Sequence, residues 1–161
     1  NLPAKYKMSA PKYQGITNEQ ISKYVLPDNG GIIEVIAGKY EDVAGTASTF
    51  TPMYVYNARL KKGARAAFTF PENYHTGILL IEGSVRVNGE TTVPTDHFAL
   101  FRNEGEMFTL EAPEDALVLV LSGEPIKEPI ATQGPFVMNT RDELVQAIRD
   151  FSLGKFGHLD D

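Results

Sequence analysis

The pattern of apolar and polar residues at positions 76–93 predicts three consecutive β-strands. Residues 78–81 form an uninterrupted apolar run, which is typical of a short strand buried on both faces. From residue 84 to residue 88 apolar and polar side chains alternate, as in a strand with one face in the core. Gly83 allows a bend between these two strands, and Asn88-Gly89 is a strong signal for a β-hairpin that leads into the third strand. The segment is typical of the middle of a small antiparallel barrel or jelly roll.

Further short strands are predicted on both sides of this segment. They cover residues 20–26, 32–37, 53–60, 64–70, 97–101, 107–111 and 116–121. Turns rich in Gly, Pro, Asn and Asp separate them. Residues 38–48 show no periodicity and are expected to form a loop. About nine short strands with frequent turns favour an all-β sandwich or barrel.

The period changes near the C-terminus, where an amphipathic helix is predicted from about residue 141 to residue 151. Thr140 and Glu143 have the spacing of a capping box, and Gly154 is a plausible C-terminal stop. The side chains that share one helical face are Leu144, Ala147, Ile148 and Phe151. This face is expected to pack against the barrel or against a partner.

The first 14 residues, NLPAKYKMSAPKYQ, differ from the rest of the chain. Prolines disfavour regular structure, and lysines alternate with tyrosine and methionine, so we expect an extended arm or linker. The predicted organisation is an arm at 1–14, a β-barrel at 15–138 and a helix with its tail at 139–161. Self-association through the arm or the helix face is a further expectation.

Composition narrows the class of function. The 161 residues are enough for one domain with a sizeable core, and the net charge of −6 argues against direct nucleic-acid binding. The absence of cysteine excludes disulfides and thiolate metal sites, and it is compatible with a reducing compartment. No apolar run approaches the roughly 18 residues that a membrane span requires, and no signal-peptide pattern is present.

Three stretches together resemble the pirin family. They are the opening residues 1–14, GILLIEGSVRVNG at 77–89, and SGEPIKEPIATQGPFVMNT at 122–140, followed by the predicted helix. The resemblance covers most of the chain and points to the C-terminal half of a pirin. Pirins are bicupins, so the implied fold is an all-β, cupin-type double-stranded β-helix or jelly-roll barrel with one C-terminal α-helix. A second, N-terminal barrel of similar size is then expected to be absent from this chain.

The resemblance also implies a function for the whole protein. Family members include metal-dependent dioxygenases similar to quercetin 2,3-dioxygenase, in which three histidines and one glutamate of the N-terminal barrel hold iron or another divalent transition metal. That barrel is the expected partner, and this chain alone is expected to be inactive and without a cofactor. The implied location is cytoplasmic, or nuclear in a eukaryote. Alternatives are a non-enzymatic regulatory module, such as a transcriptional cofactor, and a cupin that binds a small molecule.

A cupin metal site in this chain would need two histidines one residue apart, a nearby glutamate and a later histidine, because alternate strand positions face one side. When Gly83 is aligned with the glycine of the cupin motif, the ligand positions fall near Phe70, Glu72, Thr76 and Phe108. This set lacks the ligand pattern, so no metal and no catalytic residue is predicted here.

The three histidines of the chain are weak candidates. His75 lies beside Glu72 just before the central strand, and His97 follows Asp96 at a strand start. Each could serve as an alternative metal ligand, but an exposed turn or capping role is the commoner one for such positions. His158 lies in the C-terminal tail, where a function is not expected. The paired Glu104 and Glu106 are expected in a solvated loop.

Overall fold

The computed structural model describes residues 1–10 and 12–157. In chain order the strands are β1 (Ser22–Val25), β2 (Gly31–Ala37), β3 (Lys39–Tyr40), β4 (Val43–Ala44), β5 (Met53–Leu60), β6 (Arg65–Thr69), β7 (His75–Glu82), β8 (Ser84–Val87), β9 (Thr91–Pro94), β10 (Phe98–Leu100), β11 (Met107–Glu111), β12 (Ala116–Gly123), β13 (Ala131–Gln133) and β14 (Phe136–Met138). Helix α1 spans Arg141–Ser152, and short 3-10 helices span Ala4–Tyr6 and Pro27–Asn29. No helix in the described part is both long enough and apolar enough to cross a membrane.

The chain divides into two compact units. The first, here called the β-domain, is Tyr13–Pro125 and contains β1 to β12. The second, here called the terminal unit, combines Asn1–Lys12 with the chain from Ile126 onward and contains β13, β14 and α1. These limits differ from the predicted segments 1–14, 15–138 and 139–161, because residues 126–138 group with the arm and the helix.

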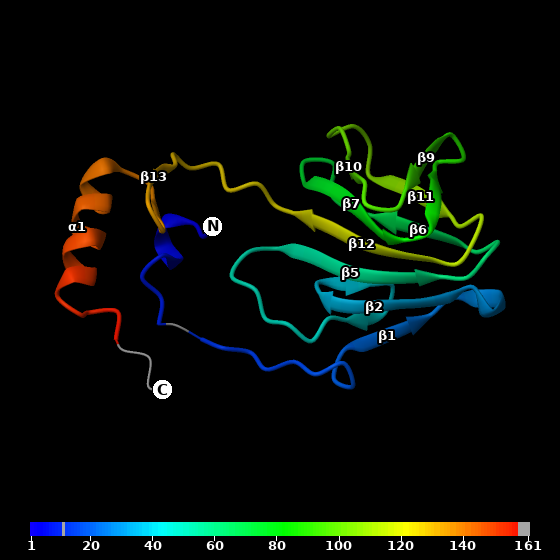
Figure 1. The fold of residues 1–161 in the computed structure, drawn as a ribbon, viewed down its shortest axis with the longest axis horizontal. Coiled ribbons are helices and arrows are strands. Elements are labelled where there is room, and N and C mark those ends of the chain that lie inside the picture. The colour runs from blue at the N-terminus through cyan, green and yellow to red at the C-terminus, as the bar shows by residue number, and fades with distance from the viewer. Residues whose placement is uncertain (11, 158–161) are drawn as a thin grey trace. The chain divides into compact units, whose positions relative to one another are not determined.

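Two large antiparallel sheets form the body of the β-domain, beside the separate two-stranded pair β3-β4 (Figure 1). The larger sheet has the strand order β1-β2-β5-β12-β7-β10, and the smaller has the order β6-β11-β8-β9. Side chains of both sheets meet in one core, with Tyr56 and Leu80 of the larger sheet and Phe68 and Leu110 of the smaller almost fully buried. The predicted all-β class with a C-terminal helix is confirmed, and the predicted barrel is seen as a sandwich of two separately paired sheets.

The central segment forms the three predicted strands, β7, β8 and β9. Gly83 has φ +71°, and a Cβ there would collide with the carbonyl oxygen of Asp115, so the bend requires glycine. Asn88 and Gly89 have φ 51° and 72°, the positive values that the predicted tight turn needs. One detail differs: the run at 78–81 is not buried on both faces, since Ile81 is exposed.

Two short hairpins were not predicted. β3 and β4 pair within residues 38–48, which were expected to be a loop, and Tyr40 of β3 is buried in the core. β13 pairs with β14 within the segment that served only to identify the family. Strands of two or three residues are too short to show a period of two, so the apolar pattern could not reveal them.

The terminal unit contains the predicted helix with its predicted capping box. The Thr140 side chain accepts a hydrogen bond from the Glu143 backbone N–H at 3.2 Å, and Oε2 of Glu143 accepts one from the Thr140 backbone at 2.9 Å. Leu144 and Ala147 are buried, and α1 contacts both β13 and β14. The arm was expected to be extended; three of its residues, Ala4–Tyr6, form a 3-10 helix.

Candidate functional site

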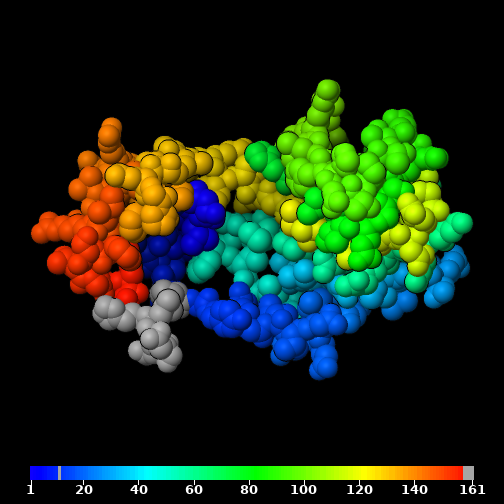
Figure 2. Space-filling model, in the orientation of Figure 1, coloured from blue at the N-terminus to red at the C-terminus, as the bar shows by residue number. Residues whose placement is uncertain are grey.

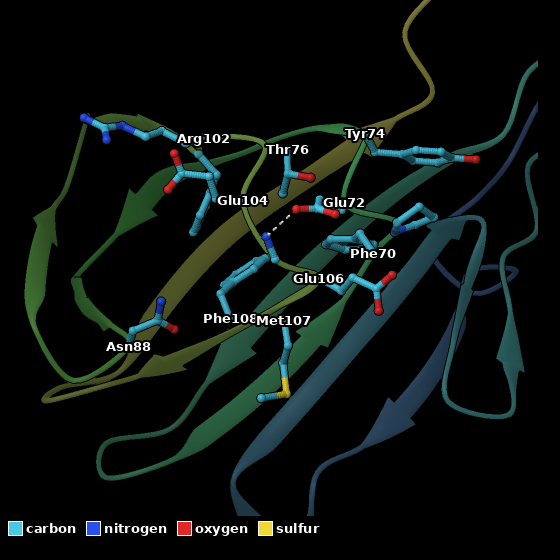
Figure 3. Close-up of a pocket in the computed structure, with 13 residues that line it drawn as sticks. Phe70, Glu72, Tyr74, Thr76, Asn88, Arg102, Glu104, Glu106, Met107 and Phe108 are labelled. Atoms are coloured by element: carbon cyan, nitrogen blue, oxygen red, sulfur yellow. Dashed lines mark hydrogen bonds between the residues drawn. The ribbon is translucent and has the colours of Figure 1, made fainter.

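A cavity of about 80 Å³ lies at one end of the β-domain, where β6 leads into β7 and where the loop at 101–106 leads into β11 (Figure 3). The four positions aligned with cupin metal ligands all contribute to its wall; they are Phe70, Glu72, Thr76 and Phe108. The structure therefore brings together residues that lie up to 38 positions apart in the sequence, as the alignment on Gly83 had indicated.

Aromatic rings occupy two of these four positions. Phe70 and Phe108 are both buried, with ring centroids 6.1 Å apart, and Phe68 stacks on Phe108 at 5.3 Å. Phe101 closes the same group, with its ring 4.3 Å from that of Phe108. A phenyl ring offers no lone pair to a metal, and packed rings of this size contribute strongly to the core. The space at these two positions is thus filled by hydrocarbon.

The other two positions carry polar groups with local partners. Glu72 is exposed, and its Oε1 accepts a hydrogen bond from the Gly105 backbone N–H at 3.2 Å, which ties the loop to the turn before β7 (Figure 3). Thr76 is buried, and its hydroxyl lies 2.8 Å from the hydroxyl of Ser122 on β12. Both groups stabilise the cavity wall through contacts between distant parts of the chain.

This set of side chains does not fit a divalent transition metal. Such ions are held by imidazole, thiolate or several carboxylates, whereas the cavity offers one carboxylate and one hydroxyl at the aligned positions. Within residues 1–10 and 12–157, no three His, Asp or Glu side chains lie close enough together to share a metal ion. The absence of a metal from this chain remains a prediction, which elemental analysis can test.

The two alternative histidines lie outside the cavity wall. His75 is the first residue of β7 and directly precedes Thr76, so its side chain faces the opposite side of the sheet from the cavity. His97 is exposed, and its Nδ1 lies 2.9 Å from the carbonyl oxygen of Thr95. His158 falls outside the described residues. The structure does not bring His75 or His97 to the aligned positions.

Most of the charged side chains in the cavity wall belong to the loop at the mouth of the cavity. Arg102, Glu104 and Glu106 are exposed, as expected for the solvated loop predicted at Glu104 and Glu106. In Figure 2 the light-green segment around residue 100 projects from the surface of the β-domain. The contribution of Tyr74 and Arg102 to the cavity wall was not predicted, because neither residue belongs to a motif or a periodic pattern.

Two buried tyrosines lie in the core next to the aromatic group. The Tyr40 hydroxyl donates to the carbonyl oxygen of Ala67 at 3.0 Å, and the Tyr56 hydroxyl donates to that of Lys39 at 2.7 Å. Burial, with a smaller effect of the neighbouring Glu41, raises the pKa of Tyr40 to about 12. Burial also raises the pKa of Tyr56. Both hydroxyls stay protonated at neutral pH and act as donors that hold strand ends together.

The two-sheet architecture of the β-domain agrees with the cupin class of β-protein, which the sequence comparison identifies. The sequence profile of the Pirin C-terminal cupin domain matches residues 55–157. A putative quercetin 2,3-dioxygenase of Pseudomonas aeruginosa is 40% identical over 156 residues, which cover 97% of this chain and 54% of that protein. Mouse pirin is 33% identical over 163 residues, which cover 98% of this chain and 55% of mouse pirin. The chain belongs to the pirin family and contains its C-terminal cupin domain.

A solved structure agrees with this assignment. The crystal structure of a quercetin 2,3-dioxygenase from Acinetobacter baumannii superposes with a TM-score of 0.90 at 42% identity. The match covers 99% of this chain and 56% of that one. The chain therefore spans about half the length of the relatives that it matches.

Proposed function

We propose that this chain is the metal-free C-terminal cupin domain of a pirin-like protein and that it supports a second, metal-bearing barrel. The observation that carries the proposal is the pair of packed rings, Phe70 and Phe108, at two of the positions aligned with metal ligands. The whole protein is then a dioxygenase similar to quercetin 2,3-dioxygenase. Its iron, or another divalent transition metal, is held in the other barrel. Cytoplasmic location, or nuclear location in a eukaryote, belongs to the same proposal.

The size of the cavity supports this division of roles. Sites for ligands of flavonol size usually enclose about 300–1,000 Å³, whereas the cavity here encloses about 80 Å³. That volume holds several water molecules, because about 10–15 Å³ of such space is enough for one. A flavonol would require displacement of Phe101, Phe108 or the loop tied down by Glu72. Binding of such a molecule in this cavity is thus the weaker alternative.

Turnover of quercetin tests the proposal. The isolated chain, supplied with ferrous or cupric ion, should consume no flavonol beyond the rate of the metal ion alone, because it has no means of binding and activating dioxygen. The two-barrel protein, expressed from the complete coding sequence, should consume flavonol at a rate proportional to its concentration. Flavonol absorbance follows both reactions.

The outcomes separate the alternatives. Metal-dependent turnover by the isolated chain, proportional to protein, would overturn the proposed supporting role. Turnover by neither protein would overturn the enzymatic part and favour the non-enzymatic regulatory module. Turnover by the two-barrel protein alone is the result expected here.

A further inference from the structure

A groove with a volume of about 340 Å³ lies on the smaller sheet, away from the cavity with the aligned positions. Its wall contains Arg65 at the start of β6, Glu111 at the end of β11 and Arg86 in β8. The cavity takes in the other ends of β6 and β11, at Phe70 and Met107. The groove and the cavity therefore lie at opposite ends of the smaller sheet and share no residue.

Strand pairing places the three charged side chains of the groove in one row across the sheet. Glu111 is the Cα partner of Arg65 on one side and of Arg86 on the other. The residues next to them along the strands are buried in the core, so the three side chains face outward. Neighbouring strands lie about 4.8 Å apart, which puts the two arginine Cα atoms about 10 Å apart, and their long side chains can reach one group between them.

The row holds two guanidinium groups but only one carboxylate. The Nε atom of Arg65 lies 3.7 Å from Oε1 of Glu111, and the two side chains are 65% and 37% exposed, so this ion pair is loose and solvated. The Arg86 side chain has no hydrogen bond or ion pair with any residue that the structure describes. One positive charge of the row is therefore uncompensated, in a protein whose net charge is −6.

The rest of the groove wall is low and uncharged. The Gly63 backbone N–H donates to the carbonyl oxygen of Ala112 at 2.7 Å, and the Ala112 N–H donates to that of Ala64 at 2.9 Å. These backbone groups are satisfied, so the Ala64 methyl group and the Pro113 ring remain as the hydrocarbon surface beside the charges. No atom of the described chain lies within 4 Å of the place where a Cβ of Gly63 would stand, which leaves this side of the groove open.

We propose that this groove binds a small organic anion, whose carboxylate or phosphate group is held by Arg86 and Arg65. The planar fork of a guanidinium group matches the oxygens of either anion in a bidentate manner. The uncharged body of the ligand lies against Ala64 and Pro113, and the groove volume falls within the roughly 300–1,000 Å³ that is usual for small-molecule sites. The proposed function assigns nothing to this groove, and the inference does not depend on it.

Nuclear magnetic resonance of the isotope-labelled chain tests the proposal at single residues. The probes are phenyl phosphate and benzoate, with benzyl alcohol as the uncharged control and inorganic phosphate as the control without a ring, all at neutral pH and constant ionic strength. Phenyl phosphate or benzoate should shift the backbone amide signals of Arg65, Arg86 and residues 111–113, and leave that of Met107 in place. Tighter binding of phenyl phosphate assigns the site to phosphate esters, and tighter binding of benzoate assigns it to carboxylates.

Three glutamine variants separate the groove from a general effect of charge. Arg86→Gln should weaken binding of the preferred probe by about tenfold or more, because it removes a charge-assisted hydrogen bond. Glu111→Gln should tighten binding several-fold, because the carboxylate that competes for Arg65 is gone. Arg141→Gln removes the same charge as Arg86→Gln from an exposed position on α1, outside the groove, and should leave the affinity unchanged. Unchanged amide signals of β5 and β12 show that each variant is folded.

Four results would each overturn the proposal. The first is the absence of probe-induced shifts at the groove, and the second is an equal loss of affinity in Arg86→Gln and Arg141→Gln. The third is weaker binding by Glu111→Gln, since the carboxylate would then help to hold the probe. The fourth is binding of inorganic phosphate or benzyl alcohol as tight as that of the preferred probe, because the groove would then not recognise an organic anion.

Discussion

Phe70 and Phe108 stand at two of the four positions aligned with cupin metal ligands. Their positions were predicted from the distance to Gly83, and the structure places both at the cavity with Glu72 and Thr76. The hydrogen bonds of Glu72 and Thr76 could not be predicted from their distance to Gly83. Thr76 pairs with Ser122, and Glu72 with the Gly105 backbone, across 46 and 33 residues. Local pattern carries no information on such distant partners until the strand order is known.

Tyr40 makes the stability of the β-domain sensitive to alkaline pH. Its pKa is about 12 in the folded chain, against about 10 in an exposed tyrosine. Between these values the unfolded chain loses its proton first, so the free energy of unfolding should fall as pH rises from 10 to 12 and be unaffected by Tyr40 below pH 10. The loss from this residue amounts to at most about 3 kcal/mol.

Urea unfolding of the wild-type chain and of Tyr40→Phe at several pH values measures this effect. The variant loses the hydrogen bond to Ala67, which costs about 1 kcal/mol at neutral pH, but its further loss between pH 10 and pH 12 should be smaller. Parallel curves for the two proteins over this range would show that Tyr40 is not the titrating group.

Strands with a regular apolar pattern were predictable at the level of elements. Residues 53–60 and 107–111 match β5 and β11, and the capping box at Thr140 correctly marks the start of α1. The burial of both faces was predicted for residues 78–81, but the structure covers only one. An apolar run specifies that a face is to be buried, but it does not specify which part of the protein covers it.

In the terminal unit one carboxylate joins the arm to the segment before α1, beside a bond from Lys7 Nζ to the Val137 carbonyl oxygen. Oε2 of Glu128 accepts hydrogen bonds from the Ala4 backbone N–H at 2.7 Å and from the Asn139 side-chain amide at 2.8 Å. Glu128→Ala removes both, and bonds to a charged acceptor contribute about 1.5–3 kcal/mol each at most. We expect the arm to detach from this unit while the β-domain stays folded.

Hydrogen exchange measured by mass spectrometry can show whether the arm detaches in Glu128→Ala. In Glu128→Ala the amides of residues 4–9 should exchange faster, and those of β5 and β12 should keep their wild-type rates. Glu104→Ala removes an exposed carboxylate from the loop at the cavity mouth and should leave the arm unchanged. Unchanged exchange in the arm of Glu128→Ala would show that other contacts hold it.

At the scale of the whole molecule, the chain has a complete core but lacks the side chains of a cupin metal site. The core of the β-domain is continuous across both sheets, and aromatic rings occupy two of the four positions aligned with cupin metal ligands. The sequence motifs predicted the family, but the apolar pattern could not show which face of β7 and β12 turns to the core, because outward and inward residues are both apolar along these strands.

Elemental analysis of the isolated chain tests the central claim most directly. The chain should be purified from cells supplied with iron, copper and nickel, without chelators, and its metal content measured against protein concentration. We expect far less than one equivalent of any transition metal, because phenyl rings occupy two of the four aligned positions. About one equivalent of a single metal, retained after gel filtration, would contradict the account.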